Sequence, residues 1–444
     1  MADEEVGGHS EPLHEKCSIG QIILKFIASV LLVGAAYYLF VGTFNSWTPE
    51  AEKDSLSLEK QDELNIRPFK KELGVDKPHL KKDSDVEVCD LSVGEWIPNP
   101  AGPAYTNETC NFIEPYQNCL MNGRPDTSYL YWKWKPNGCD LPPFDPLKFL
   151  NKMRDKSWAF IGDSIFRNHL QSLICLLSKV GEPYETYHDS TYKTRAWYYP
   201  SHNFTLHVIW APYLVHYETI DNHGNASESI TNLHLDILDS KWTSEFNKYD
   251  YVVLSGGQWF YKSTIMYENN QVIGCHNCPD MNIIELGVGE PYRKALQLSL
   301  NFIATSENKP FVILRTWTPD HFENGEWYNG GICNRTEPFK EGEINGDPTD
   351  LIMRSIEIEE FEKAKVIGES NGFKMELLDT YHLSLLRPDG HPGPYRTYHP
   401  FDGDKDKKVQ NDCLHWCLPG PIDTWNEMLM KMVFNGESTG YALS

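Results

Sequence analysis

A serine follows a buried apolar run within residues 158–174, whose sequence is WAFIGDSIFRNHLQSLI. The residues up to Gly162 read as a strand, and an amphipathic stretch begins directly after Ser164. One interpretation is that Asp163 or Ser164 caps a helix, as Asp and Ser often do. The other is that Ser164 is a nucleophile, which requires a base to take its proton and a third group to orient that base.

The segment NDCLHWCLPGPIDTWNEML, residues 411–429, offers the base and the orienting group. Asp412 and His415 are three residues apart, so on one helical turn or tight turn their side chains share a face. The carboxylate can then hold one ring nitrogen and direct the other at a hydroxyl. Cys413 and Cys417 bracket His415, and disulfides from both would fix its loop. The alternative is that Asp412 and His415 merely cap a surface loop.

His391, in RPDGHPGPYR, is a rival base. It follows Asp389 by two residues, and Pro392 and Pro394 stiffen the segment. This Pro and Gly content is more typical of a rigid turn that shapes a site.

The elements that must position these residues alternate along the chain. Apolar runs at 158–162, 204–212, 249–255, 310–316 and 373–379 predict buried strands, and periodic stretches at 165–177, 292–304 and 352–368 predict helices. Strands that alternate with helices form a parallel sheet covered on both faces. Ligands of such sheets bind beyond the carboxyl ends of the strands, and Ser164 falls at one of those ends.

The composition limits the kinds of partner. The 444 residues carry a formal net charge of −23, which argues against nucleic acid because there is no surplus of Lys and Arg to displace phosphate counterions. The 13 Trp and 23 Tyr suit stacking on sugar rings, although aromatic side chains more often form the core.

The chain before residue 89 predicts a membrane anchor. Residues 26–44 form an uncharged apolar run long enough for a transmembrane helix, residues 1–25 a cytosolic tail, and residues 45–88 a solvated stem. Ten of the 11 cysteines follow the run, with Cys17 before it. The glycosylation sequons also follow it, at Asn107, Asn203, Asn225 and Asn334. Both features favour a type II single-pass protein whose large domain lies in an oxidising, glycosylating lumen.

Two regions follow the stem. Residues 89–145 are rich in Cys, Trp, Tyr, Pro and Gly, which predicts a loop-rich lobe that is stapled by disulfides and wraps a larger body. Residues 146–435 hold the alternating strands and helices and predict the catalytic domain.

A Gly-Asp-Ser after a strand, paired with a late Asp-x-x-His, resembles the GDSL/SGNH hydrolase superfamily. The chain is more closely similar to the trichome birefringence-like polysaccharide O-acetyltransferases of plants, from residue 89 to about residue 433. The stretches that carry this resemblance are GDSIFRNHLQSLICLL, RTWTPDHFENGEWYNGGIC, LLRPDGHPGPYR and DCLHWCLPGPIDTWNEML. The resemblance implies an SGNH-like three-layer α/β/α domain with a parallel sheet. It also implies a Golgi membrane protein.

By this resemblance Ser164 is the nucleophile, His415 the general base and Asp412 its orienting carboxylate. An acetyl-serine forms, and a sugar hydroxyl then attacks it. VIGCHNC and RPDGHPGPYR look most like members assigned to hemicellulose backbones, with xyloglucan as the first expectation and mannan or xylan as alternatives. No bound cofactor is expected. The acetyl donor, acetyl-coenzyme A or another acetyl carrier, enters as a co-substrate.

The acyl oxyanion needs preorganised donors. The backbone N–H of Ser164 at a helix N-terminus is one, and Arg167 and Asn168, three and four residues on, return to the same side of the helix. The superfamily expects Gly-x-Asn in the stretch LSGGQWF, where Gln258 replaces the Asn. Gly256, Gly257 and Gln258 are the candidate replacements. Arg315 and the Trp-rich segment 317–331 are candidates for lining the acceptor groove, against core packing as the alternative.

The family pattern implies disulfides Cys89–Cys139, Cys110–Cys175, Cys119–Cys417 and Cys333–Cys413. For Cys275 and Cys278, a C-x-x-C spacing also suits zinc, but no second such motif or paired His accompanies it. A small disulfide loop and no metal are therefore predicted. Two other functions remain open: a carbohydrate acetylesterase, if water reaches the acyl-serine, and a non-catalytic glycan-binding protein.

Overall fold

The computed structural model describes residues 89–220, 229–278, 281–403 and 408–436. The predicted tail, transmembrane run and stem lie outside these residues, as do Cys17 and Asn225. Within the described part of the chain, no helix combines the length and apolar character needed to cross a bilayer.

A seven-stranded sheet forms the centre of the molecule, in the order β13-β12-β9-β3-β6-β5-β4. The strands from β13 to β6 are parallel to their neighbours, and β5 and β4 extend the sheet in antiparallel fashion. The bounds are β3 Ser157–Gly162, β4 Tyr184–His188, β5 Arg195–Tyr199, β6 Phe204–Trp210, β9 Tyr251–Leu254, β12 Phe311–Arg315 and β13 Lys374–Leu378. All five predicted strands are present, with ends that shift by one or two residues.

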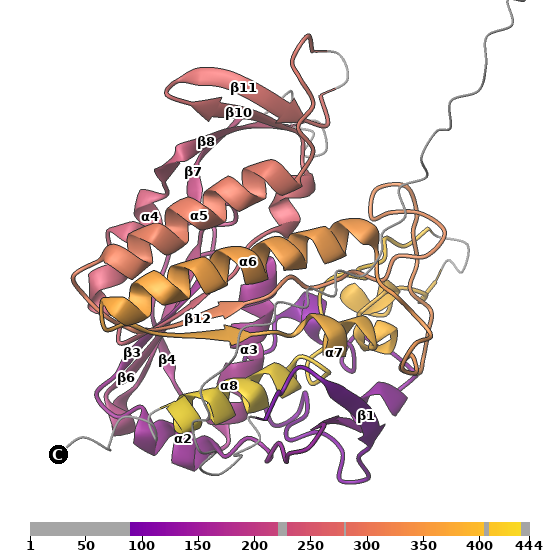
Figure 1. Cartoon of the computed structure of the whole chain (residues 1–444). Helices are drawn as coiled ribbons and strands as arrows, with labels where there is room; N and C mark the ends of the chain where they lie inside the picture. Colours follow the sequence, from indigo (N-terminus) through magenta and orange to yellow (C-terminus); the bar gives the residue numbers. More distant parts are fainter. Residues whose placement is uncertain (1–88, 221–228, 279–280, 404–407, 437–444) are drawn as a thin grey trace, which may run out of the picture. The chain divides into compact units, whose positions relative to one another are not determined.

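Helices cover both faces of this sheet, as Figure 1 shows. Side chains alternate along each strand, so Trp158 and Phe160 pack toward α3 and α8, whereas Ala159 and Ile161 pack toward α5 and α6. The α/β/α expectation therefore holds for this sheet. The helix bounds are α2 Pro146–Lys152, α3 Ser164–Ser178, α4 Ser240–Thr243, α5 Gly289–Thr305, α6 Pro348–Ser370, α7 Tyr381–Leu385 and α8 Asp423–Gly436.

A second sheet of four strands, in the order β11-β10-β8-β7, stands beside the first and was not predicted (Figure 1). Its parallel pair is β10 with β8, and its other pairs are antiparallel. The bounds are β7 Val215–Ile220, β8 Ile230–Leu238, β10 Thr264–Glu268 and β11 Gln271–His276.

The N-terminal lobe contains little regular structure, namely the antiparallel pair β1 (Gly94–Pro98) and β2 (Trp132–Pro136) and two short 3-10 turns. Trp96 Nε1 donates to the carbonyl oxygen of Leu383 in α7 at 2.8 Å. Figure 1 shows the lobe beside α7 and α8, so it packs against this side of the α/β body.

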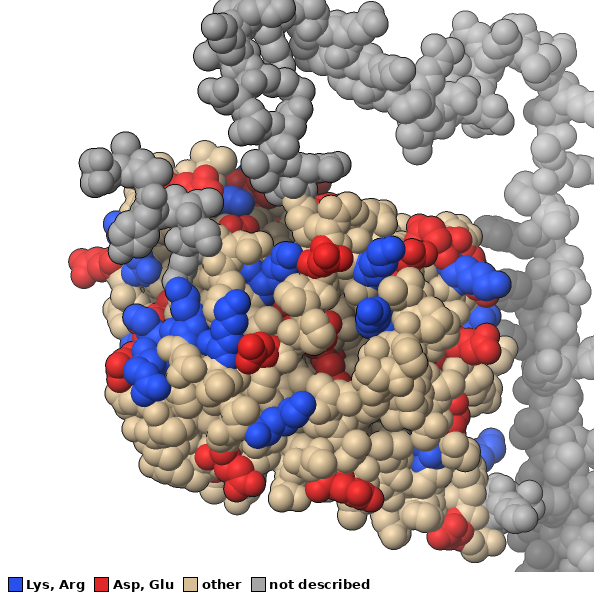
Figure 2. Space-filling view, turned by 90° about the horizontal axis from the view of Figure 1, so that it is seen from below, with Lys and Arg blue, Asp and Glu red and all other residues tan. Residues whose placement is uncertain are grey.

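One face of the molecule carries charged residues of both signs. On this face, shown in Figure 2, several Lys and Arg gather in one group on the left with Asp and Glu at its margins, and elsewhere the two signs alternate among a majority of other residues. This face therefore presents no uniformly basic surface of the kind that nucleic acid requires.

Candidate active site

Ser164 is the first residue of α3, directly after the buried strand β3. The preceding Asp163 is the N-cap, and its carboxylate accepts a hydrogen bond from Ile165 N at 2.9 Å. Ser164 therefore does not serve as the cap, and its side chain is partly exposed at the positive end of the helix dipole. Gly162 allows this arrangement, because a Cβ there would lie 2.4 Å from the Ser255 carbonyl oxygen of β9's continuation.

Asp412 and His415 meet in a tight turn rather than a helix. Asp412 Oδ1 accepts from the backbone N–H of Leu414 and of His415, and Oδ2 lies 2.9 Å from His415 Nδ1. Burial raises the pKa of Asp412, but the charge of His415 and the hydrogen bonds from its ring and backbone outweigh this and hold that pKa far below its usual value. The carboxylate thus stays ionised and leaves His415 Nε2 for proton transfer.

Asn168 brings His415 to the start of α3. Its side-chain oxygen accepts from Trp416 N at 2.7 Å, and its amide nitrogen donates to Trp416 O at 3.2 Å. Since Asn168 lies one turn after Ser164, the residue next to His415 is tied to the first turns of the helix that begins at Ser164. His415 is also near enough that its charge lowers the pKa of Asp163, although burial is the larger effect and raises it.

Asn168 is fully buried. The predicted place of Asn168 among the oxyanion donors therefore needs correction, because its amide group is engaged by the backbone of Trp416 instead of facing an open site.

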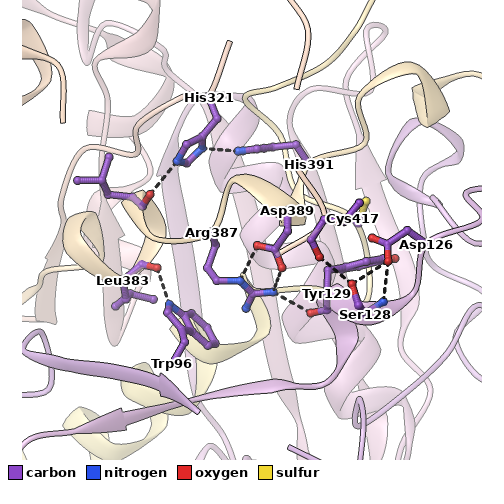
Figure 3. A network of polar contacts seen from close by, with 12 residues as sticks. Trp96, Asp126, Ser128, Tyr129, His321, Leu383, Arg387, Asp389, His391 and Cys417 are labelled. Carbon is purple, nitrogen blue, oxygen red and sulfur yellow. Dashed lines mark hydrogen bonds and ion pairs between the residues drawn. The ribbon is translucent and has the colours of Figure 1, made fainter. Parts of the chain in front are cut away.

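His391, the rival base, is buried behind His415. Its Nδ1 lies 2.7 Å from the His415 carbonyl oxygen, and its Nε2 lies 2.7 Å from His321 Nδ1. Figure 3 shows the contact between the rings of His321 and His391, and His321 Nε2 in turn lies 2.9 Å from Leu385 O. Both ring nitrogens of His391 are therefore used inside the protein, and its geometry is that of a support for the backbone of His415.

The row from Leu385 O through both rings to His415 O contains three contacts of hydrogen-bond length. Two neutral imidazoles carry only two ring protons, so the complete row requires one more and then bears a positive charge. Burial lowers the pKa of His321 to about 4 and also lowers the pKa of His391. The neutral pair therefore prevails near neutral pH, with one of the three contacts lacking a proton.

The N-terminal lobe holds the same segment from the other side. Arg124 donates to the carbonyl oxygens of His391 at 2.8 Å and Asp389 at 2.6 Å. Arg387 and Asp389 form a fully buried two-pronged ion pair, and Arg387 also donates to Tyr129 O of the lobe (Figure 3). A rigid turn was expected here, whereas its attachment to the lobe was not readable from spacing.

Gly257 and Gln258 follow β9, the strand adjacent to β3. Gly257 has φ +133°, and a Cβ there would lie 2.3 Å from the Trp317 ring, so only glycine fits. Gln258 is partly exposed, and its amide nitrogen donates to Thr318 O at 2.5 Å. The carbonyl oxygen of Gly256 accepts a hydrogen bond from the Tyr292 hydroxyl at 3.0 Å, which supports the backbone of this segment.

Glu357 of α6 completes that support. Its carboxyl lies 2.5 Å from the Tyr292 hydroxyl and accepts from Trp317 N at 2.6 Å. Burial raises the pKa of Glu357 to about 8, so it is mainly neutral at pH 7. A neutral Glu357 donates to the Tyr292 oxygen, and the Tyr292 hydroxyl then donates to Gly256. Sequence periodicity alone gave no sign of this chain of bonds.

Arg315 and Trp317 are core residues, which corrects their candidacy for the acceptor groove. Both are buried, and Arg315 donates to Ser255 Oγ at 2.9 Å and Thr318 Oγ1 at 2.5 Å. Further along the same segment, Trp327 and Tyr328 remain 50% and 66% exposed.

Arg167 is partly exposed and donates to the Tyr116 hydroxyl of the lobe at 2.5 Å. It lines a surface hollow of about 230 Å³, counting its open mouth, whose walls come from α3, β5, β6 and the lobe. This hollow lies on the helix that begins with Ser164.

The structure joins the five cysteine pairs that the family pattern and the C-x-x-C loop implied. Cys275, Cys278 and Glu285 are close enough to hold a metal ion, but the disulfide leaves no thiolate there. Among the described sequons, Asn203 and Asn334 are exposed and Asn107 is partly exposed.

The site is accompanied by clear similarity to known proteins. Residues 141–432 match a family described as the GDSL/SGNH-like acyl-esterase family found in Pmr5 and Cas1p, and residues 87–140 match the PMR5 N-terminal domain.

Individual relatives cover most of the chain. The chain is 56% identical to protein trichome birefringence-like 26 of Arabidopsis thaliana, over 80% of this chain and 79% of that protein. It is 50% identical to protein trichome birefringence-like 25 of the same plant, over 94% and 93%. It is also 45% identical to xyloglucan O-acetyltransferase 1 of Arabidopsis thaliana, over 79% and 81%.

Proposed function

We propose that this chain, which belongs to the GDSL/SGNH-like acyl-esterase family, is a polysaccharide O-acetyltransferase that acts through an acetyl-serine. The observation that carries the proposal is the Asp412–His415 pair, 2.9 Å apart and tied through Trp416 and Asn168 to the helix that begins at Ser164. The relatives named as xyloglucan O-acetyltransferases support the reaction type.

In the first half-reaction, Ser164 Oγ attacks the acetyl carbonyl carbon while His415 Nε2 takes the hydroxyl proton. The tetrahedral intermediate then collapses, the bond to the donor's leaving group breaks, and His415 returns the proton to that group. Asp412 stabilises the imidazolium between these steps. The N-terminal end of α3 and the Gly256–Gln258 segment are the donors proposed for the oxyanion, since both follow neighbouring strands.

In the second half-reaction, a sugar hydroxyl takes the place of the leaving group. His415 removes the hydroxyl proton, the sugar oxygen attacks the acetyl carbon, and Ser164 Oγ leaves with the proton from His415. The acceptor proposed first is the xyloglucan backbone, with mannan and xylan as alternatives. The relatives of highest identity given above have names that specify no substrate, so the acceptor must be measured.

Exposed aromatic side chains support a glycan acceptor. Trp327 and Tyr328 are exposed, and their segment is joined to the catalytic turn because Gln410 donates to Trp327 O at 3.3 Å. Flat, exposed aromatic faces suit the apolar faces of sugar rings. We also propose that the domain lies in the Golgi lumen behind a single membrane anchor at residues 26–44, as the sequons and cysteines favour.

The deciding experiment incubates the full-length protein with an acetyl donor and oligosaccharides of xyloglucan, mannan and xylan, and records their masses. Gain of 42 Da units on one acceptor, absent with Ser164→Ala, is the expected result. Loss of acetyl groups from acetylated oligosaccharides without any gain would show an esterase instead. Binding of the oligosaccharides with no change in mass, by both proteins alike, would favour a glycan-binding protein.

A further inference from the structure

Two lysines lie against a pair of tryptophans at the carboxyl edge of the central sheet. Lys193 Nζ is 4.7 Å from the Trp210 ring centre, and Lys262 Nζ is 3.8 Å from the Trp259 ring centre. The two rings meet edge to face with centres 5.2 Å apart. Trp210 is buried, and the other three side chains are partly buried, so this cluster is built into the fold rather than free on the surface.

The fold places this cluster next to the catalytic serine. Trp210 is the last residue of β6 and pairs in register with Gly162, two residues before Ser164. Trp259 follows directly after Gln258, in the segment proposed to stabilise the oxyanion. Arg167, from the first turn of the nucleophile's helix, is close enough for its charge to act on Lys193.

The lysines of the cluster form no ion pair in the part of the chain that the structure describes. Neither Lys193 nor Lys262 lies within ion-pair distance of a carboxylate there, whereas Lys248 pairs with Glu245 and Lys156 with Asp250. Burial lowers the pKa of Lys193 and Lys262, and a neighbouring cation lowers each further, Arg167 for the first and Lys193 for the second. Asp189 raises the pKa of Lys193, but burial and the neighbouring cations outweigh it. Partly buried like charges of this kind are relieved by an anion.

We propose that Lys193, Lys262 and Arg167 bind the phosphate-bearing leaving group of the acetyl donor. The inference rests on the proposed function and adds the chemical class of the donor. Ammonium and guanidinium groups form charge-assisted hydrogen bonds to phosphate oxygens, and the two indoles hold the ammonium groups in place by cation–π contact. A neutral glycan would leave the charge of the three cations uncompensated.

The reaction stays balanced with such a donor. The acetyl carbon forms its bond to Ser164 Oγ and loses its bond to the sulfur or oxygen of the leaving group, which departs with the proton that His415 took from Ser164. The phosphates take no part in bond making, and the cations hold them so that the acetyl group reaches Ser164.

The test uses the full-length protein in neutral detergent and titrates inorganic pyrophosphate by calorimetry. The wild type should bind it, and the Lys193→Gln/Lys262→Gln variant should bind it about tenfold more weakly or not at all. Lys248→Gln, which removes a lysine that is already paired with Glu245, is the matched control and should bind like the wild type. A wild type that does not bind, or a double variant that binds equally well, overturns the proposal.

A second measurement separates the sources of the phosphate. Acylation of Ser164 is followed by mass spectrometry with acetyl-coenzyme A and with uncharged p-nitrophenyl acetate. If the donor is soluble, the double variant should lose about tenfold more rate with acetyl-coenzyme A than with the uncharged ester. Pyrophosphate binding without use of acetyl-coenzyme A supports the same site with the phosphate on another carrier. Failure of every donor to acylate Ser164 would refute the proposed function but not the binding result.

Discussion

His391 Nδ1 lies 2.7 Å from the carbonyl oxygen of His415, so one buried imidazole supports the backbone of the residue whose own imidazole is the proposed base. The two rings have different surroundings. His415 is paired with an ionised carboxylate and is 20% exposed, whereas His391 is enclosed between Trp416, His321 and the backbone. A positioning role for His391 and a chemical role for His415 follow from this difference.

Replacing His391 by Ala should lower the rate of Ser164 acylation by about 10- to 100-fold, because the backbone of His415 loses a support while the base itself remains. The pH dependence of the residual acylation rate should keep the midpoint of the wild type. Stopped-flow acylation with p-nitrophenyl acetate from pH 5 to 9 measures both quantities. If the acylation rate no longer depended on pH in His391→Ala but still did in His415→Ala, His391 would be the base and His415 the positioning residue.

Replacing Ser164 or His415 by Ala should abolish nearly all acetyl transfer. The loss of transfer rate in Asp412→Asn should be about a hundredfold smaller than in either of these variants. The base survives in Asp412→Asn, but its ring is poorly oriented and its charged form is no longer stabilised by a carboxylate. Transfer to oligosaccharides, measured alongside the melting temperature of each variant, tests this order. Full activity of a folded Ser164→Ala protein would be incompatible with the mechanism.

Asn168→Ala should reduce acylation about 10- to 100-fold and lower the melting temperature, since it leaves the buried N–H and C=O of Trp416 without their partner. Asn168→Asp keeps the oxygen that accepts from Trp416 N, but its second oxygen donates to Trp416 O only when protonated. Activity of Asn168→Asp relative to wild type should therefore rise as the pH falls. An equal loss at every pH would mean that the contact to Trp416 O contributes nothing.

Glu357→Gln should change the pH dependence of stability. In wild type the pKa of Glu357 is raised from 4.5 to about 8. The contribution of protonated Glu357 to the free energy of unfolding is therefore fully present below the unfolded-state pKa and is lost as the pH rises through about 8. Glutamine reproduces the neutral acid, with its N–H₂ donating to Tyr292 and its oxygen accepting from Trp317 N. The difference in urea-unfolding free energy between the variant and wild type should grow in the variant's favour from pH 5 to 8.5. A difference that is constant over this range would show that Glu357 is already ionised in the folded protein.

The central layers of the fold were predictable because their strands are short continuous apolar runs, such as residues 158–162, between strongly periodic helices. The second sheet was not, because its strands have one polar face and its parallel pair joins β8 to β10 across an intervening segment. Likewise β4 is exposed along its whole length and carries no burial signal.

The Asp412–His415 pair was predictable from a spacing of three residues, since local geometry decides it. The contact of Asn168 with Trp416 spans 248 residues, and no local pattern encodes it. The sequence left Arg315 open between the acceptor groove and the core. Its actual burial follows from the hydroxyl groups of Ser255 and Thr318 and the nearby carboxyl groups of Asp163 and Glu357, which only the fold brings together.

His415 lies between two cross-links that lead to different parts of the molecule. Cys413 is joined to Cys333, and Cys417 is joined to Cys119 in the N-terminal lobe. In a newly made chain whose thiols are still reduced, the turn of His415 would be held by its hydrogen bonds to Asn168 and His391 but by neither covalent link. Oxidation would thus complete the fixing of this imidazole, and a reductant would loosen it.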